Sequence, residues 1–363
     1  MAPEQYGPYR VYEQLGEGGM ATVHRAEQDT PAGIKQIALK RLTPTLDKKN
    51  VGLFLDEARL LRYLHHPNIP ETYDSGRVFG TYFIAMEYIE GWTVKSLIDH
   101  CSATVGPVPV PIVLNLAGQL CDALDYAHKR CAEHGKPLRI IHRDVTPSNL
   151  IIDRTGVLKL VDFGLAKATV ATEPSTAGII KGKLGYVSPE YTRGSLDHRA
   201  DLWAVGIIMY ELLTGRRLFD GANAADTVSR VRELPIPRPS LGNPEVTSAV
   251  DNIVMTALER DPRQRCSSAA SLRTQIQAHL STREDPADNR AVIQWITAAF
   301  EEKRPRAKVM TPVVPSPVVA LPPVMTSTPS FPTAPVRWNP RTLVIVCGLL
   351  LLVIGVIVAT LLR

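Results

Sequence analysis

Two acidic motifs on either side of one short strand restrict most severely what this chain can fold into. Asp144 is followed five residues later by Asn149, and Asp162 comes directly after an apolar strand expected at 157–161. Carboxylates do not bind a phosphoryl group directly, so Mg²⁺ must bridge the two, and Mg²⁺ prefers hard oxygen ligands such as those of Asn149 and Asp162. Asp144 would instead orient an attacking hydroxyl and accept its proton. The fold must therefore bring these side chains together.

The run from Ile140 to Asn149, followed by Asp162-Phe163-Gly164, resembles the catalytic and Mg²⁺-binding loops of bacterial eukaryotic-like (Hanks-type) serine/threonine protein kinases. The three-residue motif alone would also suit a turn, but both motifs in this order favour the family. The resemblance covers about residues 9–281. It implies an α+β fold of two lobes, with a small β-rich N-lobe at about 9–88 and a large helical C-lobe at about 89–281.

A glycine-rich turn between two strands lies near the N-terminus. Glycines let the backbone close over phosphates where a Cβ would obstruct, although many other turns look similar. The third glycine of the family's pattern is Ala21 here. By resemblance, the residues that bind the nucleotide are Leu15, Gly16, Glu17, Gly18, Gly19, Met20, Ala21, Thr22, Val23, Ala38, Lys40, Glu87, Ile89 and Ile151.

Lys40 ends a short strand on which Ala38 and Lys40 share a face. A lysine at a strand end can simply be exposed, but its spacing after the glycine turn favours a functional role. By resemblance, Lys40 grips the α- and β-phosphates of ATP, and Glu57 on the following helix holds it. Asp56 would point about 100° away around that helix, so Glu57 is the expected partner.

Two departures from the family's pattern occur together. Members usually carry a lysine two residues after the catalytic aspartate, where this chain has Thr146. They usually carry a threonine shortly before the Pro-Glu pair, where this chain has Lys183. These two side chains touch in folds of the family, so we infer a reciprocal exchange. Lys183 would supply the cation near the γ-phosphate and Thr146 the hydroxyl. The alternative is a kinase weakened by the loss of its lysine.

The segment after Gly164 carries several hydroxyl side chains, namely Thr169, Thr172, Ser175 and Thr176. Such residues are common in any polar loop. An arginine beside the catalytic aspartate, here Arg143, can however pair with a phosphate on the loop and order it. The pattern therefore predicts autophosphorylation of this segment.

The run from Asp201 to Gly215 is apolar over almost its whole circumference, which predicts a helix buried on all sides, capped by Asp201 and ended by Gly215. By resemblance, it is the central helix of the large lobe, and Asp201 holds the backbone of the catalytic loop. The resemblance also pairs Arg265 with Glu190 as a structural contact.

The C-terminal part has a different composition. A helix is expected at 285–302, packed on the large lobe or on a partner, followed by a Pro-rich juxtamembrane linker at 303–341. Residues 343–362 are uncharged and long enough to cross a ~30 Å hydrocarbon layer, the alternative being a buried core helix. We expect a single-pass membrane anchor with the kinase domain in the cytoplasm. Gly355 and Ala359 form a small-xxx-small pair that would suit a homodimer.

Composition disfavours several other classes of protein. The net charge is +5 and no basic-aromatic module is present, so we expect no nucleic-acid partner. The five cysteines are scattered without a C-x-x-C spacing, which argues against a disulfide framework or a zinc site. No apolar segment follows Met1, and we expect no cleavable secretory signal.

Taken together, the sequence predicts a membrane-tethered serine/threonine kinase that uses ATP and Mg²⁺ to phosphorylate protein substrates. A pseudokinase scaffold that binds nucleotide without turnover is the competing hypothesis. Thr146 and Ala21 favour it, whereas the residues expected to act in transfer oppose it. A kinase of small molecules is a third possibility, opposed by the Pro-Glu segment and its loop of hydroxyl residues.

Overall fold

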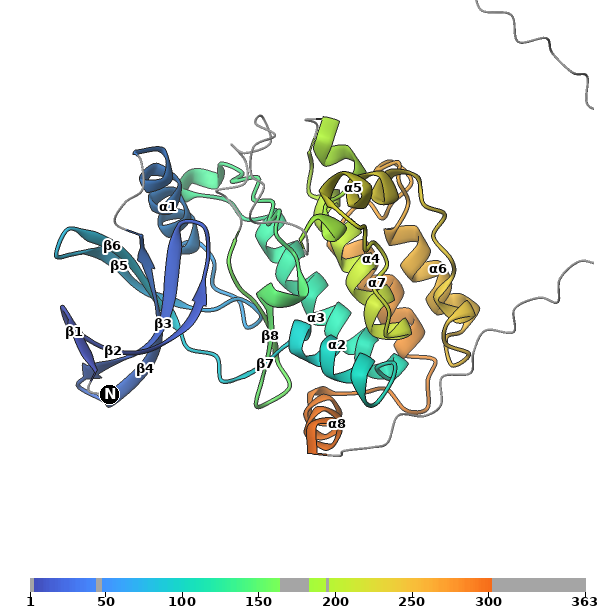
Figure 1. The fold of residues 1–363 in the computed structure, drawn as a ribbon, viewed down its shortest axis with the longest axis horizontal. Coiled ribbons are helices and arrows are strands. Elements are labelled where there is room, and N and C mark those ends of the chain that lie inside the picture. Colours follow the sequence, from blue (N-terminus) through green and yellow to red (C-terminus); the bar gives the residue numbers. More distant parts are fainter. Residues whose placement is uncertain (1–2, 44–47, 164–182, 194–195, 302–363) are drawn as a thin grey trace, which may run out of the picture. The chain divides into compact units, whose positions relative to one another are not determined.

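A computed structural model describes residues 3–43, 48–163, 183–193 and 196–301. All of these belong to one compact unit, Met1–Val309, and none belongs to the second unit, Met310–Arg363. Figure 1 shows a β-rich lobe and a helical lobe within the first unit. The two-lobed α+β fold expected from the sequence is confirmed.

The small lobe is built on one antiparallel sheet with the strand order β1-β2-β3-β4-β6-β5. Alternation of apolar residues along the strands produces its core, in which Ile37 and Leu39 pack with Tyr9 and Phe83. The sequence did not reveal β1, where the Tyr6 hydroxyl donates to the carbonyl oxygen of Thr81 at 3.0 Å. The strands are β1 (Glu4–Tyr6), β2 (Tyr9–Glu17), β3 (Ala21–Thr30), β4 (Gly33–Leu42), β5 (Thr72–Val78) and β6 (Thr81–Glu87).

Helix α1 (Lys48–Leu61) follows β4 and is amphipathic. Its buried face consists of Phe54, Ala58 and Leu61 together with one charged residue, Glu57. A buried carboxylate is costly unless a cation compensates it. Glu57 is therefore expected to have a cationic partner in the small lobe.

The large lobe is organised around α4 (Arg199–Thr214), every residue of which from 200 to 214 is buried. Gly215 ends this helix in the left-handed conformation, with a φ of 65°. The predicted cap was wrong, because the helix begins after His198 and Asp201 lies inside its first turn. The other helices are α2 (Val94–Ala103), α3 (Val110–His128), α5 (Ala224–Glu233), α6 (Ser248–Ala257) and α7 (Ala269–Leu280).

A small sheet of β7 (Gly91–Thr93), β8 (Leu150–Asp153) and β9 (Leu158–Leu160) lies beside α2 in Figure 1. It requires a glycine at its edge, because a Cβ at Gly91 would lie 2.0 Å from the carbonyl oxygen of Ile152. The turn between β8 and β9 contains Gly156, whose φ is +83°. The catalytic loop leads into β8, and the segment that contains Asp162 follows β9.

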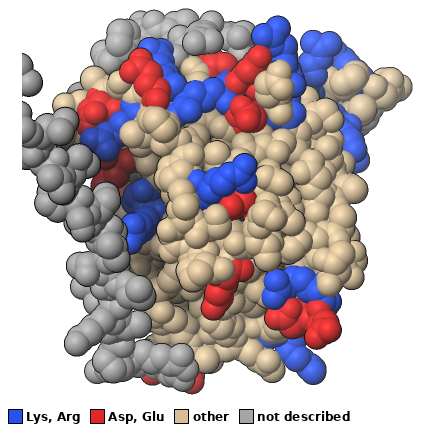
Figure 2. All heavy atoms as spheres, turned by 90° about the vertical axis from the view of Figure 1, so that its right-hand side faces the viewer, with Lys and Arg blue, Asp and Glu red and all other residues tan. Residues whose placement is uncertain are grey.

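On the face of the large lobe that Figure 2 shows, acidic and basic side chains are interspersed rather than separated. Within the described ranges, no helix has the length and apolar character needed to span a bilayer. The membrane segment predicted at 343–362 and the linker predicted at 303–341 lie outside the described residues, as do Thr169, Thr172, Ser175 and Thr176.

The expected accessory helix is α8 (Asn289–Glu301), and it packs on the large lobe. Val292 and Ile296 join the core of that lobe, and Phe300 stacks on His100 of α2 with ring centroids 4.3 Å apart. His100 also makes a hydrogen bond to the carbonyl oxygen of Ala299 at 2.8 Å. The close approach of α8 to the β8–β9 turn depends on Gly156, since a Cβ there would lie 2.1 Å from the carbonyl oxygen of Asn289.

Because Ile296 is fully buried, its truncation tests whether α8 belongs to the cooperative fold. We expect Ile296→Ala to lower the free energy of unfolding by about 2–5 kcal/mol, the usual cost of such a cavity. The matched control is Gln294→Ala, an exposed position on the same helix. Urea unfolding followed by circular dichroism measures both variants, and equal stabilities for the two would contradict this packing.

Candidate active site

The site centres on Lys40, a buried lysine at the junction of the two lobes. Its Nζ donates to Glu57 Oε1 at 2.6 Å and to Asp162 Oδ1 at 3.1 Å. Lys40 comes from β4, Glu57 from α1, and Asp162 from the segment after β9. The pair of Lys40 with Glu57 that the sequence predicted is present, and the structure adds Asp162 to it.

Electrostatics in this cluster favour the charged forms of Lys40 and Asp162. Burial alone would lower the pKa of Lys40, but the carboxylates of Asp162 and Glu57 outweigh burial and raise it. The ammonium of Lys40 in turn lowers the pKa of Asp162, whose side chain is 43% exposed. Burial raises the pKa of Glu57, although Lys40 opposes that effect. Lys40 thus neutralises a buried carboxylate and holds a second one at the edge of the site.

Asp201 of α4 fixes the backbone of the catalytic loop. Its two carboxylate oxygens accept the backbone N–H groups of His142 and Arg143, each at 2.9 Å. Asp201 Oδ2 also makes a hydrogen bond to His128 Nε2 at 2.8 Å. Arg143 has a φ of 65°, a left-handed conformation that is strained for a residue other than glycine. The contacts to Asp201 hold the loop in that conformation, so the role expected for Asp201 is present although its capping role is not.

Asp144 is buried beside two donors. Asn149 Nδ2 donates to the carbonyl oxygen of Asp144 at 2.9 Å and to its Oδ2 at 3.0 Å. Lys183 Nζ donates to the same Oδ2 at 2.9 Å. Thr146 lies in the loop between them, and its buried Oγ1 has no hydrogen-bond partner among the described residues. Lys183 thus meets Asp144 as a cation, whereas the Thr146 hydroxyl makes no contact of the expected kind here.

Asn149 and Asp162 offer hard oxygen atoms of the kind that Mg²⁺ prefers. Asn149 turns its amide nitrogen towards Asp144, which leaves the amide oxygen as the ligand atom. Across the described ranges, no cluster of three or more His, Cys, Asp or Glu side chains could enclose a metal by itself. This donor set therefore fits a Mg²⁺ ion whose remaining ligands come from phosphate groups and water.

The residues expected to bind nucleotide come from both lobes. Leu15 on β2 is an apolar side chain left 46% exposed, as expected of a surface that a base would cover. Val23 on β3 pairs with Lys40 on β4, which places the glycine turn next to the lysine. The N–H of Glu87 is already used, since it donates to the carbonyl oxygen of Glu71 at 2.8 Å. The remaining expected residues lie at the end of β2, on the β2–β3 turn, at the start of β3, on β4, after β6 and on β8.

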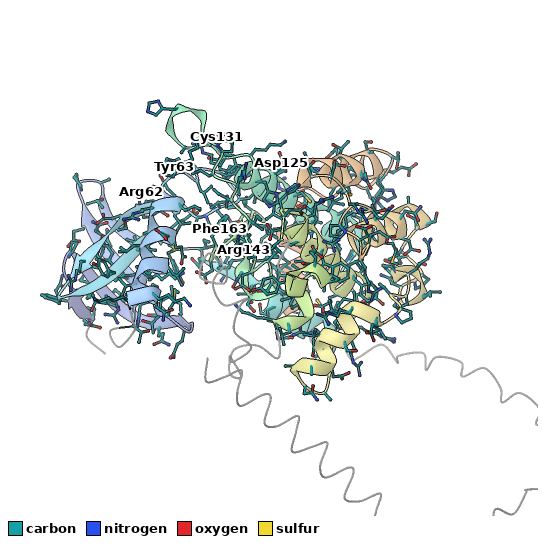
Figure 3. The ribbon with its side chains drawn as sticks, turned by 90° about the horizontal axis from the view of Figure 1, so that it is seen from above. Arg62, Tyr63, Asp125, Cys131, Arg143 and Phe163 are labelled. Carbon is teal, nitrogen blue, oxygen red and sulfur yellow. The ribbon has the colours of Figure 1, made fainter. Side chains whose placement is uncertain are left out.

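Phe163 follows Asp162 into the interior and packs on the ring of His142, with centroids 4.5 Å apart. Figure 3 places Phe163 and Arg143 at the junction of the lobes. Asp162 has a φ of 57°, so the two aspartate motifs each contain one left-handed residue. Gly164, the last residue of its motif, lies outside the described ranges.

The segment that ends in the Pro-Glu pair is anchored to the far side of the lobe. Arg265 makes a two-pronged ion pair with Glu190, with both N···O distances at 2.7 Å, and the guanidinium is fully buried. A planar guanidinium matched to a carboxylate fixes orientation as well as distance. The contact that the sequence predicted is therefore present.

One contact at the end of β6 was not predicted from the sequence. Lys159 of β9 is buried and pairs with Glu87 at the end of β6, with Nζ 2.7 Å from Oε1. The available signal was a single charged residue within the apolar strand at 157–161. This pair connects the end of β6 to the small sheet of the large lobe.

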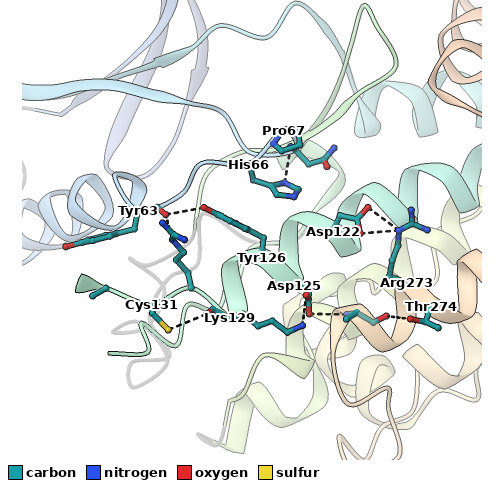
Figure 4. A pocket seen from close by; sticks show the side chains of 14 residues that line it. Tyr63, His66, Pro67, Asp122, Asp125, Tyr126, Lys129, Cys131, Arg273 and Thr274 are labelled. Carbon is teal, nitrogen blue, oxygen red and sulfur yellow. Dashed lines mark hydrogen bonds and ion pairs between the residues drawn. The ribbon is translucent and has the colours of Figure 1, made fainter. Parts of the chain in front are cut away.

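A separate groove of about 1150 Å³ lies between α3, α7 and the connection from α1 to β5. Its carboxylates are paired, as Figure 4 shows for Asp122 with Arg273. Asp125 is likewise paired with Lys129 at 2.7 Å. The groove contains none of the residues expected to act in phosphoryl transfer.

The two lobes and the ion-pair network between them match the architecture of a protein kinase that the sequence implied. Residues 9–279 match the model of the protein kinase domain. The tyrosine-protein kinase MasK of Myxococcus xanthus (strain DK1622) is 33% identical over 282 residues, covering 77% of this chain and 44% of MasK. The serine/threonine-protein kinase PrkC of Bacillus subtilis (strain 168) is 34% identical over 271 residues, covering 74% of this chain and 40% of PrkC.

The chain belongs to the protein kinase domain family. The solved kinase domain of PknI from Mycobacterium tuberculosis agrees, with 25% identity and a TM-score of 0.57 over 77% of this chain and 98% of that domain. The chain spans less than half the length of MasK and of PrkC. What the chain shares with these relatives is therefore the kinase domain.

The buried ion pair of Lys40 with Glu57 predicts a pH-dependent loss of stability. In Lys40→Met, Glu57 loses the cation that opposes its raised pKa, so this pKa rises further. Stability is then lost as the pH rises through that pKa, because the unfolded state ionises Glu57 more readily. Breaking a buried pair costs about 3–5 kcal/mol. We expect urea unfolding to show a larger loss at pH 8 than at pH 5.

The double variant Lys40→Met/Glu57→Gln is the control, because it contains neither member of the pair. Its loss of stability relative to the wild type should depend less on pH than that of Lys40→Met. A loss in Lys40→Met that is equal at pH 5 and pH 8 would contradict the assignment.

Proposed function

We propose that this chain transfers the γ-phosphoryl group of ATP to serine or threonine hydroxyls of protein substrates. The observation that carries the proposal is Lys40 bound to both Glu57 and Asp162. This contact aligns the phosphate-binding lysine with a metal-binding carboxylate, and protein kinases need both in place. The relatives whose names state serine or threonine as the acceptor support the choice of substrate.

Each residue of the site would have a distinct task. Asp144 would orient the acceptor hydroxyl and take its proton as the bond to phosphorus forms. Lys40 would hold the α- and β-phosphates. A Mg²⁺ ion held by Asn149 and Asp162 would neutralise charge on the phosphates. The turn between β2 and β3 would cover the nucleotide and exclude water.

A pseudokinase scaffold is the second candidate. Thr146 in place of a lysine and Ala21 in place of a glycine are the observations that favour it. Lys40, Glu57 and Asp162 oppose it, since Lys40 binds both carboxylates, and a scaffold without turnover would not require this geometry.

Asp144→Asn separates the two candidates. The full chain should transfer labelled phosphate from ATP to a mixed protein substrate in the presence of Mg²⁺, and acid hydrolysis should release phosphoserine and phosphothreonine. The variant keeps the size of the side chain but cannot accept the proton, so we expect transfer to fall at least about 100-fold. Nucleotide binding should survive, as a thermal shift with ATP would show. Binding without transfer in the wild type would favour the scaffold.

We also propose that the chain phosphorylates its own segment at 165–188. Arg143 supports this, because its buried Nε has no hydrogen-bond partner among the described residues and the residue adjoins Asp144. A phosphate brought to that guanidinium would gain charge-assisted hydrogen bonds. Phosphopeptide mapping of the same reaction is the test, and no phosphate anywhere in 165–188 would reject autophosphorylation of this segment.

A third part of the proposal is a single-pass membrane tether at 343–362 that leaves the kinase domain in the cytoplasm and gives the bilayer as a partner, with a possible homodimer through Gly355 and Ala359. The uncharged composition of the segment supports it. We expect the full chain to resist carbonate extraction from membranes. Val353→Arg should weaken that association, because a charge at the centre of the span is costly. Equal extraction of both proteins into the soluble fraction would count against the tether.

A further inference from the structure

Between Asp144 and Asn149 the catalytic loop carries no cationic side chain, and Arg143 precedes Asp144. The residues from Asp144 to Asn149 are Asp-Val-Thr-Pro-Ser-Asn. Lys40 is engaged by Glu57 and Asp162. Lys183 forms an ion pair with Asp144, although it lies 39 positions further along the chain and directly follows the undescribed segment.

Lys183 contacts Asp144 and acts on Asp162 through its charge. Its Nζ is 2.9 Å from Asp144 Oδ2, and its charge also helps to lower the pKa of Asp162. Its side chain remains 35% exposed, so the ammonium is not sealed into the core. An ammonium has three N–H donors, and the bond to Asp144 uses one of them. The others can meet an oxygen that arrives from the open side.

Thr146 and Lys183 share one small pocket. This pocket of about 40 Å³ is lined by both residues together with Asp144 and Ser188. The buried Oγ1 of Thr146 and the buried Oγ of Ser188 both lack hydrogen-bond partners among the described residues. A space of this size does not accept a second long side chain. The short residue at position 146 is therefore the condition under which Lys183 can reach Asp144.

We propose that Lys183 is the catalytic cation of phosphoryl transfer, supplied from the segment before the Pro-Glu pair instead of from the catalytic loop. This inference rests on the proposed kinase activity and names a residue for it. Without a cation, the carboxylate of Asp144 would repel the phosphoryl group that it must face. Lys183 offsets that repulsion and donates to the phosphoryl oxygens as the bond to the leaving phosphate breaks and the bond to the acceptor oxygen forms.

Because Lys183 directly follows the segment at 164–182, the proposal also links that segment to catalysis. The cation reaches Asp144 only when the chain before the Pro-Glu pair runs close to the catalytic loop. Arg265 and Glu190 anchor the other end of this stretch. The position of Lys183 is thus set by a buried contact seven residues further along the chain.

A reciprocal exchange tests the proposal. Lys183→Met removes the charge but keeps a side chain of similar length. We expect it to lower kcat on the order of 100-fold, while the KM for ATP changes less than about threefold. Thr146→Lys alone should also be impaired, since two lysines compete for one pocket. The double variant Thr146→Lys/Lys183→Thr supplies the cation from the catalytic loop instead. We expect it to recover activity to within about tenfold of the wild type.

If Lys183 only held the structure together, this rescue would not occur, because the double variant lacks the ion pair of Lys183 with Asp144. A wild-type kcat in Lys183→Met, or a double variant no better than Lys183→Met, overturns the proposal. If the double variant does not fold, Lys183→Arg decides, because activity well above that of Lys183→Met supports the need for a cation and equal activity refutes it. An active wild type with an inactive Asp144→Asn and a fully active Lys183→Met would refute this inference alone. An inactive wild type would refute the kinase activity itself.

Discussion

The catalytic loop depends on the buried carboxylate of Asp201. An ionised carboxylate inside a protein is tolerated only when donors surround it. Burial opposes the ionisation of Asp201, but the hydrogen bond and charge of His128 and the N–H groups of the catalytic loop hold its pKa below the usual value. Asp201 is carried by α4, the most completely buried helix described. The catalytic loop therefore has little freedom, because moving it would leave a charge in the core without partners.

Lys40 imposes a similar constraint between the lobes. Three elements must meet for its charge to be compensated, namely β4, α1 and the distant segment after β9. The buried pair is expensive to break, so the arrangement that balances the charges is also the one that aligns the site. Catalytic geometry and electrostatic compensation are thus the same requirement for these residues. Lys183 extends this logic to Asp144, where a cation from one segment balances an acid on another.

The sequence was sufficient where a motif is local. The spacing of Asp144, Asn149 and Asp162 anticipated the loop geometry, because a loop fixed by a few backbone bonds keeps neighbours together. It failed where the outcome depends on distant partners. The sequence placed a helix cap at Asp201, but the helix begins after His198; the contact of Asp201 with the N–H groups of the catalytic loop was expected from the resemblance and is present. No local pattern gives the partner of Lys159, which is Glu87, or that of Phe300, which stacks on His100. Both contacts depend on tertiary packing.

The contact of α8 with Gly156 has a consequence for how this domain is delimited. The family match ends at residue 279, yet the core continues to Ala299. The recognisable unit and the folding unit therefore differ by one helix. A chain cut at the end of the match would present to solvent the apolar surface that Val292 and Ile296 now cover, and exposed surfaces of that kind cause proteins to associate. Loss of solubility, more than loss of catalysis, is the change expected when the chain is cut before α8.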